Sequence, residues 1–170
     1  MSETATVHGT CIALPEGAVL LRGAPGSGKS DLALRLLDMA DARLVADDQV
    51  VLTRDHEAGI VLASVPEPLG GLLEVRGVGV ISLGAGRWVT YAPLVAVIDL
   101  AARPDDVPRA PGVVMRDPMA VAPGDDEADG AIPVRGFTLW PFEASAPAKV
   151  RLVVSVAAHG LVPLTEGEPS

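Results

Sequence analysis

The clearest chemical signal in the chain is an eight-residue stretch that reads Gly-Ala-Pro-Gly-Ser-Gly-Lys-Ser and fits the pattern GxxxxGK[ST]. Its residues are Gly23, Ala24, Pro25, Gly26, Ser27, Gly28, Lys29 and Ser30. Glycines let the backbone curl until several N–H groups point at one anion, so such a loop can hold the β- and γ-phosphates of a nucleotide. Lys29 supplies a cation for the same oxygens, and the Ser30 hydroxyl is placed to bind Mg²⁺. The stretch therefore predicts a polyphosphate site.

The segments on either side of this loop are of the kind that must position it. Ala18–Leu21 is a short apolar run typical of a buried strand. Residues 31–40 place their leucines near helical spacing, and this helix is expected to begin at Lys29, with Asp31 in its first turn, where a carboxylate suits the dipole. The order strand, loop and helix argues against a chance match to the pattern.

A pair of aspartates, Asp47 and Asp48, follows a second apolar run, Arg43–Ala46. Phosphoryl transfer needs a carboxylate for the metal ion and a group that accepts the proton of the nucleophile. In an open α/β sheet the carboxyl ends of strands gather at one edge, so the pair is expected beside the phosphate loop. One aspartate would hold Mg²⁺, and the other would accept a hydroxyl proton. On spacing alone, two aspartates in an ordinary turn after a strand are an equal alternative.

A third constellation is Leu73–Gly77, which reads Leu-Glu-Val-Arg-Gly. Glu74 is a candidate second ligand of Mg²⁺, which usually takes only one or two protein carboxylates. Arg76 is a candidate for stabilising charge on the transferred phosphoryl group. Taken alone, the segment fits a half-exposed strand equally well, and His8 fits a surface residue near the N-terminus.

Composition limits the classes of protein that the chain can belong to. With 170 residues, 49% of them hydrophobic, a single domain over residues 1–170 is expected, with a core at about 7–160. The net charge of −9 argues against nucleic acid as a partner. No apolar run approaches the roughly 18 residues of a membrane span, and no signal peptide is recognised, so no membrane contact is expected. A single cysteine, Cys11, excludes an intramolecular disulfide and fits a reducing cytoplasm.

The order of the apolar segments indicates an α/β fold with a mixed β-sheet and few helices. Further strands are expected at residues 50–52, 59–65, 94–100 and 137–142. A closing helix is expected at 149–159, and residues 104–130, rich in proline, glycine and aspartate, are expected to be loop. Several neighbouring strands without helices between them favour a mixed sheet over a purely parallel one.

Four motifs in fixed order resemble a known family. His8-Gly9, the phosphate loop, Arg43–Asp48 and Leu72–Val80 together resemble the catalytic domain of HPr kinase/phosphorylase. The resemblance covers roughly residues 7–160 and implies a P-loop domain of the kind found in HPr kinase and PEP carboxykinase. It also implies an ATP- and Mg²⁺-dependent kinase that phosphorylates a serine of HPr, the carrier protein of the sugar phosphotransferase system. Family members assemble as hexamers, so a homo-oligomer is implied.

The resemblance also implies a role for each matching position. The implied site residues are His8, Lys29, Ser30, Asp47, Asp48, Glu74, Arg76 and Arg109. Ser30 and Glu74 match the magnesium-binding pair, and the aspartate pair matches the acidic pair whose carboxylate accepts the serine proton. Register against the motif favours Asp48 as that base, with Asp47 nearer the metal. Arg109 matches the later catalytic arginine of the family.

Some features depart from the family pattern. Full-length members carry an N-terminal domain of comparable size, and the chain is expected to be a short form without it, as in some proteobacteria. Ala24-Pro25 stand where an acidic residue usually follows the first glycine. The segment Glu143–Lys149 replaces a basic, glycine-containing segment associated with phosphorolysis, which argues against the reverse reaction. A kinase for a small molecule, a nucleotide-sensing module without catalysis, and pyrophosphate as the donor remain open alternatives.

Overall fold

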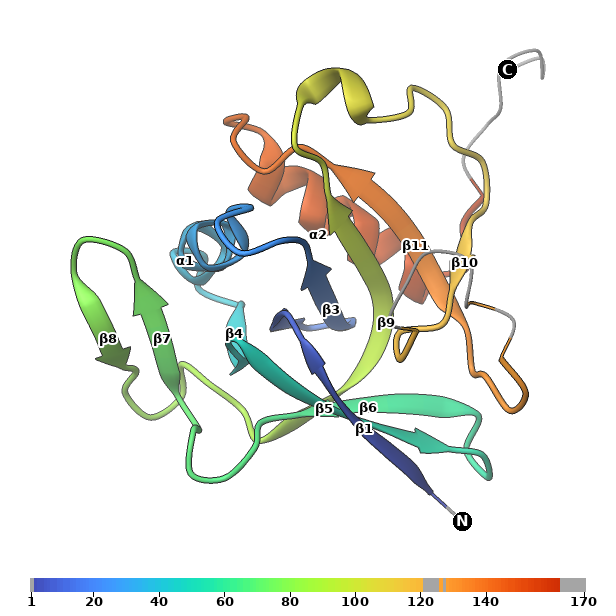
Figure 1. Cartoon of the computed structure of the whole chain (residues 1–170), viewed down its shortest axis with the longest axis horizontal. Coiled ribbons are helices and arrows are strands. Elements are labelled where there is room, and N and C mark those ends of the chain that lie inside the picture. The colour runs from blue at the N-terminus through green and yellow to red at the C-terminus, as the bar shows by residue number, and fades with distance from the viewer. Residues whose placement is uncertain (1, 121–125, 127, 163–170) are drawn as a thin grey trace.

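The computed structural model describes residues 2–120, 126 and 128–162. In this part of the chain a nine-stranded sheet, a separate two-stranded hairpin and two α-helices are arranged as Figure 1 shows. The strands of the large sheet are β1 (Glu3–His8), β2 (Thr10–Leu14), β3 (Gly17–Arg22), β4 (Arg43–Ala46), β5 (Gln49–Asp55), β6 (Ile60–Ser64), β9 (Tyr91–Leu100), β10 (Met115–Arg116) and β11 (Val134–Leu139). The remaining elements are the hairpin of β7 (Leu72–Val75) and β8 (Gly79–Ser82), the helices α1 (Lys29–Leu37) and α2 (Ala146–Ala158), and the 3₁₀ turn η1 (Pro104–Asp106).

The large sheet is mixed, as expected from the sequence. Its order is β1-β5-β6-β9-β3-β2-β4, with β11 on the other side of β9 and β10 paired to β11. The pairs β3–β9 and β11–β9 are parallel, and the remaining pairs are antiparallel. Strand β2 lies between β3 and β4 and is antiparallel to both. The first residues of β2 therefore meet the last residues of β3 and β4 at one edge.

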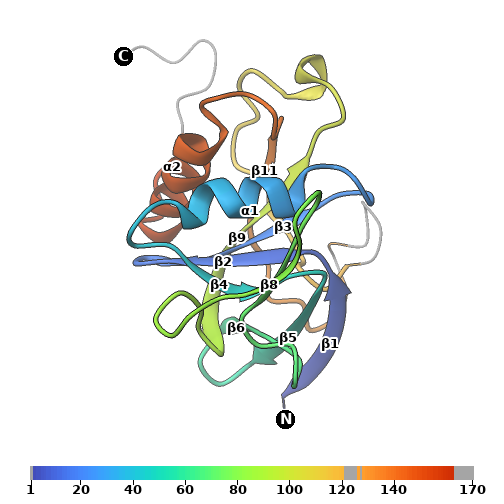
Figure 2. The same cartoon turned by 90° about the vertical axis from the view of Figure 1, so that its left-hand side faces the viewer.

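The central strands of the sheet are buried on both faces because the sheet curls. Alternate residues of β3 point to opposite faces, so Val19 and Leu21 pack under the helices while Leu20 packs on the other side. In Figure 2, α1 and α2 lie on one side of β2, β3 and β4, and β1, β5 and β6 curl over the other. Burial on both sides explains why β3 reads as a continuous apolar run.

Several element boundaries differ from those expected. The helix expected to extend to residue 40 ends at Leu37, where Asp38 closes the last turn by donating its N–H to the carbonyl of Leu34. The strand expected at 137–142 is β11, which ends at Leu139 ahead of Pro141. The closing helix begins at Ala146 instead of 149, because Pro147 suits a first turn, where its missing N–H is not needed.

Strands β1 and β2 were not expected. β1 is rich in threonine and half exposed as it pairs with β5. His8 is thus held in an ordered strand. No helix in the described residues is both long and apolar enough to cross a membrane.

Candidate active site

The phosphate loop connects β3 to α1, as its flanking segments predicted. Gly26 and Gly28 have φ values of 78° and 97°, in the left-handed region that glycine adopts without strain. Gly28 caps α1, and its carbonyl accepts the N–H of Leu32 at 2.9 Å. A Cβ atom at position 28 would also lie 3.0 Å from the ring of Phe142, so the ring would have to move by a few tenths of an ångström. The left-handed backbone therefore favours glycine at position 28, and the nearby ring adds a smaller constraint.

Lys29 is the first residue of α1, and its side chain is folded back over the loop. Its Nζ donates to the carbonyls of Gly23 at 2.8 Å and Ala24 at 3.0 Å, and to Oγ of Ser27 at 3.4 Å. Burial lowers the pKa of Lys29, and the negative charges of the aspartate pair after β4 act in the opposite direction. The aspartates therefore favour the protonated lysine that an anionic ligand needs.

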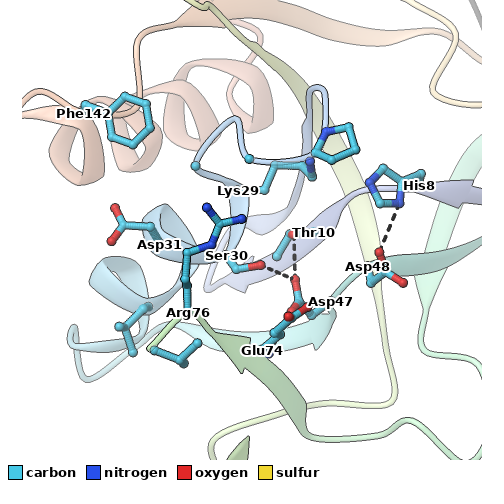
Figure 3. A pocket seen from close by; sticks show the side chains of 15 residues that line it. His8, Thr10, Lys29, Ser30, Asp31, Asp47, Asp48, Glu74, Arg76 and Phe142 are labelled. Carbon is cyan, nitrogen blue, oxygen red and sulfur yellow. Dashed lines mark hydrogen bonds and ion pairs between the residues drawn. The ribbon is translucent and has the colours of Figure 1, made fainter. Parts of the chain in front are cut away.

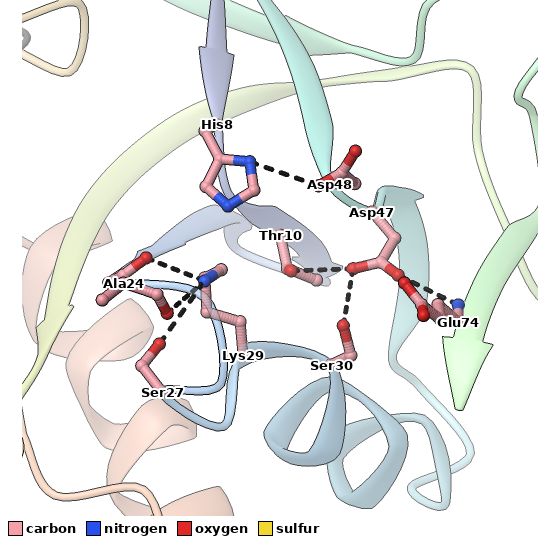
Figure 4. A network of polar contacts seen from close by, with 10 residues as sticks. His8, Thr10, Ala24, Ser27, Lys29, Ser30, Asp47, Asp48 and Glu74 are labelled. Carbon is pink, nitrogen blue, oxygen red and sulfur yellow. Dashed lines mark hydrogen bonds and ion pairs between the residues drawn. The ribbon is translucent and has the colours of Figure 1, made fainter. Parts of the chain in front are cut away.

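Asp47 is the centre of a hydrogen-bond network that joins three segments (Figure 4). Its Oδ1 accepts the hydroxyl of Thr10 at 2.8 Å and the hydroxyl of Ser30 at 3.0 Å. Its Oδ2 accepts the backbone N–H of Glu74 at 3.0 Å. Strand β2, helix α1 and the hairpin are thus tied to one carboxylate, which neutral donors hold in place.

Asp48 has a different environment, although it is the next residue. Its φ of 69° is left-handed, a conformation that aspartate adopts more readily than most residues, and its carbonyl accepts the N–H of Gly9 at 3.1 Å. Its carboxylate faces His8, with 3.2 Å between Oδ1 and Nδ1. The two side chains are 65% and 51% exposed, so this pair is open to an incoming molecule. In Figure 4 the side chain of Asp48 points toward His8, whereas that of Asp47 points toward Thr10 and Ser30.

The hairpin of β7 and β8 brings the third motif to the same place. Leu73 is fully buried and anchors the hairpin in the core under α1, while Glu74 and Arg76 are exposed. Both line one pocket together with His8 and the phosphate loop. The half-exposed strand considered as an alternative is therefore present, and its polar residues face the pocket.

This pocket has a volume of about 470 Å³, and Figure 3 shows its side chains. It is lined by His8, Thr10, Pro25, Gly26, Gly28, Lys29, Ser30, Asp31, Leu34, Asp47, Asp48, Glu74, Val75, Arg76 and Phe142. Of the expected loop residues, Gly23, Ala24 and Ser27 lie behind it as partners of Lys29. Arg109 lies on an exposed bend after η1 and is not brought to this pocket.

Two lining residues that the sequence did not reveal are Thr10 and Phe142. Thr10 is fully buried in an otherwise apolar strand, two residues after His8, and no motif marks it. Phe142 precedes α2 in the sequence Pro-Phe-Glu and is 54% exposed. A large exposed ring is an unusual feature in a chain with only two phenylalanines, but its place beside the loop required the structure.

The oxygen atoms around Asp47 fit a magnesium ion better than a metal held by protein alone. Among the described residues no group of three or more histidine, cysteine and acidic side chains could hold a metal. Mg²⁺ prefers oxygen and usually takes one or two carboxylates, with phosphates and waters completing its shell. The Ser30 hydroxyl and the carboxylates of Asp47 and Glu74 are ligands of that kind.

Comparison with known proteins agrees with this geometry. A family model described as HPr Serine kinase C-terminal domain matches residues 1–89, which is more than half of the chain. The chain belongs to this family. The matched residues include the phosphate loop, the aspartate pair and the hairpin.

Curated relatives and a solved structure extend the comparison. HPr kinase/phosphorylase of Geobacillus sp. (strain WCH70) is 39% identical over 104 residues, and that of Bacillus mycoides (strain KBAB4) is 38% identical over 104 residues. These alignments cover 59% of the chain and 33% of each relative, so the chain matches about a third of their length. The HPr(Ser) kinase/phosphatase of Coxiella burnetii has the same fold, with a TM-score of 0.69, 22% identity, and coverage of 89% of this chain and 88% of the other. The expected fold is confirmed.

Proposed function

We propose that the chain is a Mg²⁺- and ATP-dependent serine kinase that acts on HPr or an HPr-like phosphocarrier protein. The observation that carries this proposal is the division between the two aspartates beside the phosphate loop. Asp47 is held by three neutral donors, and Asp48 is exposed and faces a histidine. Binding a nucleotide requires no proton acceptor, so this second carboxylate favours a kinase over a nucleotide-sensing module.

The donor half of the site is formed by the loop and the residues around Asp47. The loop N–H groups and Lys29 would bind the β- and γ-phosphates of ATP, and the positive end of the α1 dipole favours their negative charge. Ser30, Asp47 and Glu74 would hold Mg²⁺, which neutralises charge on the phosphate oxygens. Thr10 would keep the Asp47 carboxylate oriented, because its hydroxyl donates to the same oxygen as Ser30.

The acceptor half is formed by Asp48 and His8. The Asp48 carboxylate would accept the proton of the serine hydroxyl as the serine oxygen bonds to the γ-phosphorus. The bond between that phosphorus and the β–γ bridging oxygen breaks, and ADP leaves. His8 would orient the carboxylate through its contact at 3.2 Å, and Arg76 would stabilise the negative charge on the transferred group.

The acceptor protein is proposed from the family. The curated relatives are named HPr kinase/phosphorylase, and the family model matches residues 1–89, which include every residue that lines the pocket except Phe142. We further propose that the chain forms a homo-oligomer, a hexamer by family resemblance. It would act in the cytoplasm, without nucleic acid or membrane partners. It treats residues 1–170 as one catalytic domain.

The forward reaction is proposed as the main one. In the segment that departs from the family pattern, Lys149 is paired with Glu143 at 2.6 Å, so its charge is already compensated. This pairing supports the proposal that the reverse reaction, phosphorolysis of phosphorylated HPr, is slow. Incubating phosphorylated HPr with inorganic phosphate and following its loss of mass tests this part of the proposal separately.

The central experiment mixes the chain with Mg²⁺, ATP and purified HPr and measures the mass of HPr. An increase by one phosphoryl group is expected with the wild-type chain, and no increase with Lys29→Ala or with EDTA. An unchanged mass with the wild-type chain contradicts the proposal. Phosphorylation of a metabolite without HPr would indicate a small-molecule kinase. Binding of ATP without phosphoryl transfer would indicate a nucleotide sensor, and transfer from pyrophosphate alone would indicate that the donor is not ATP.

A further inference from the structure

The pocket has two chemically different ends, with the phosphate loop between them. In Figure 3, His8 and Asp48 lie at one end and Phe142 at the other, with Lys29 and Ser30 between. The end with the histidine and the aspartate is polar. Phe142 lies at the opposite end, on the same side as Asp31, and the apolar side chain of Leu34 also lines the pocket.

The helix geometry gives this apolar end a fixed relation to the phosphates. Leu34 lies four residues after Ser30 on α1, and residues at that spacing lie on the same face of a helix. A triphosphate on the loop, with its last phosphate toward the aspartate pair, would have its other end toward the side of the pocket that holds Phe142. In a nucleoside triphosphate that end carries the sugar and the base.

The ring of Phe142 is exposed but held in position. It is 54% exposed, it packs edge-on against Trp140 with 6.1 Å between ring centroids, and it rests against Gly28. Arg35 of α1 donates to the carbonyls of Pro141 and Glu143, on either side of Phe142, at 3.2 Å for Glu143. A large apolar ring that is fixed and open to solvent is suited to receive a flat ligand without further ordering.

We infer that Phe142 and Leu34 form the seat of a nucleobase, with the Phe142 ring stacked on the base. The seat makes the donor a nucleoside triphosphate instead of pyrophosphate or another inorganic polyphosphate, which have nothing to place there. This inference rests on the proposed function only in taking the loop as the phosphate site. The competing explanation is that the ring only packs against Gly28 and stabilises the phosphate loop. Binding measurements distinguish this structural role from stacking on a base.

The test compares two ligands, Mg-ATP and Mg-tripolyphosphate, by isothermal titration calorimetry without HPr. Aromatic stacking on a base contributes enough for the wild-type chain to bind ATP about 10-fold more tightly than tripolyphosphate. Phe142→Ala should remove this difference by weakening ATP alone, and Phe142→Tyr, which keeps the ring, should retain it. Leu152→Ala is the matched control, because Leu152 is a similarly exposed side chain on α2 outside the pocket.

Three results would overturn the inference. Equal losses for both ligands in Phe142→Ala would show that the ring only supports the loop. Unchanged ATP affinity in that variant, or equal affinities of the wild-type chain for the two ligands, would show that no base is bound there. If the wild-type chain binds neither ligand, the phosphate site fails and the proposed function fails with it.

Discussion

Replacing Thr10 by valine tests whether a buried hydroxyl keeps Asp47 ready for magnesium. The Thr10 side chain is fully buried, and its hydroxyl donates to Oδ1 of Asp47 at 2.8 Å. Valine has almost the same shape but no donor, so the change removes the hydrogen bond without creating a cavity. Ser30 and the N–H of Glu74 remain as partners of the carboxylate. The carboxylate should stay in the site but lose one of its three constraints.

The size of the effect follows from the charge of the acceptor. A hydrogen bond to a charged group contributes about 1.5–3 kcal/mol, about twice the value for neutral partners. If about half of that contribution orients Asp47, the apparent affinity for Mg²⁺ in the presence of ATP should fall about 4- to 13-fold. The remainder should appear as a lower free energy of unfolding.

The assay is the rate of HPr phosphorylation as a function of Mg²⁺ concentration, with urea unfolding measured in parallel. Thr10→Ser retains the donor and should restore the wild-type Mg²⁺ dependence. Thr53→Val is the matched control, because Thr53 makes an exposed hydrogen bond to Thr4 at 3.3 Å, far from the pocket. If Thr10→Val loses stability while its Mg²⁺ dependence stays that of the wild type, the hydroxyl is purely structural and the reasoning is refuted.

Three further predictions follow from individual contacts. Asp47→Asn should raise the Mg²⁺ concentration needed for the half-maximal rate at least about 10-fold. Asp48→Asn should leave Mg-ATP binding by calorimetry unchanged and reduce the rate of phosphoryl transfer at least about 100-fold. Similar binding defects in both variants would contradict the division of roles. Burial raises the pKa of the Cys11 thiol above its ordinary value of 9.0, so the folded chain keeps a proton that the unfolded chain loses. Stability should therefore fall as the pH rises above about 9, Cys11→Ala should flatten this dependence, and the native thiol should resist iodoacetamide; rapid native alkylation would argue against the buried position. Arg54 and Asp117 form an ion pair at 2.6 Å, and both side chains are almost fully buried. Arg54→Leu should therefore lower the free energy of unfolding by about 3 kcal/mol in urea titrations, and changing Asp117 to leucine as well should recover most of that loss. A double variant as unstable as the single one would show that packing, and not the unpaired charge, causes the loss.

The phosphate loop and its neighbours could be predicted because their signals are local. Glycine, lysine and serine at fixed spacing, between an apolar run and a leucine-rich helix, are compatible with few local structures other than a phosphate loop. The helix α1 begins at Lys29, as predicted. The position of the aspartate pair was also right, but the expected reason was incomplete. β4 is parallel to β3 without being its neighbour, because β2 lies between them.

What the sequence could not show depends on pairing between distant segments. Strand β1 reads as polar because it is a half-exposed strand paired with β5, so no apolar run marks it. Thr10 has no signal of its own, since its meaning comes from Asp47, 37 residues away. Phe142 likewise becomes informative only when the segment before α2 is placed against Gly28.

The left-handed backbone at Asp48 limits how this position can change over evolutionary time. Residues that adopt such a conformation readily are glycine, asparagine, aspartate and, less often, histidine. Among them, aspartate is the only one that offers a carboxylate, and glutamate would keep the charge only with about 1–2 kcal/mol of backbone strain. A lineage that replaces aspartate here by asparagine or glycine would therefore keep this backbone conformation while losing the proposed base. We therefore expect substitution at position 48 to be the simplest route to a related protein that still binds nucleotide but no longer transfers a phosphoryl group.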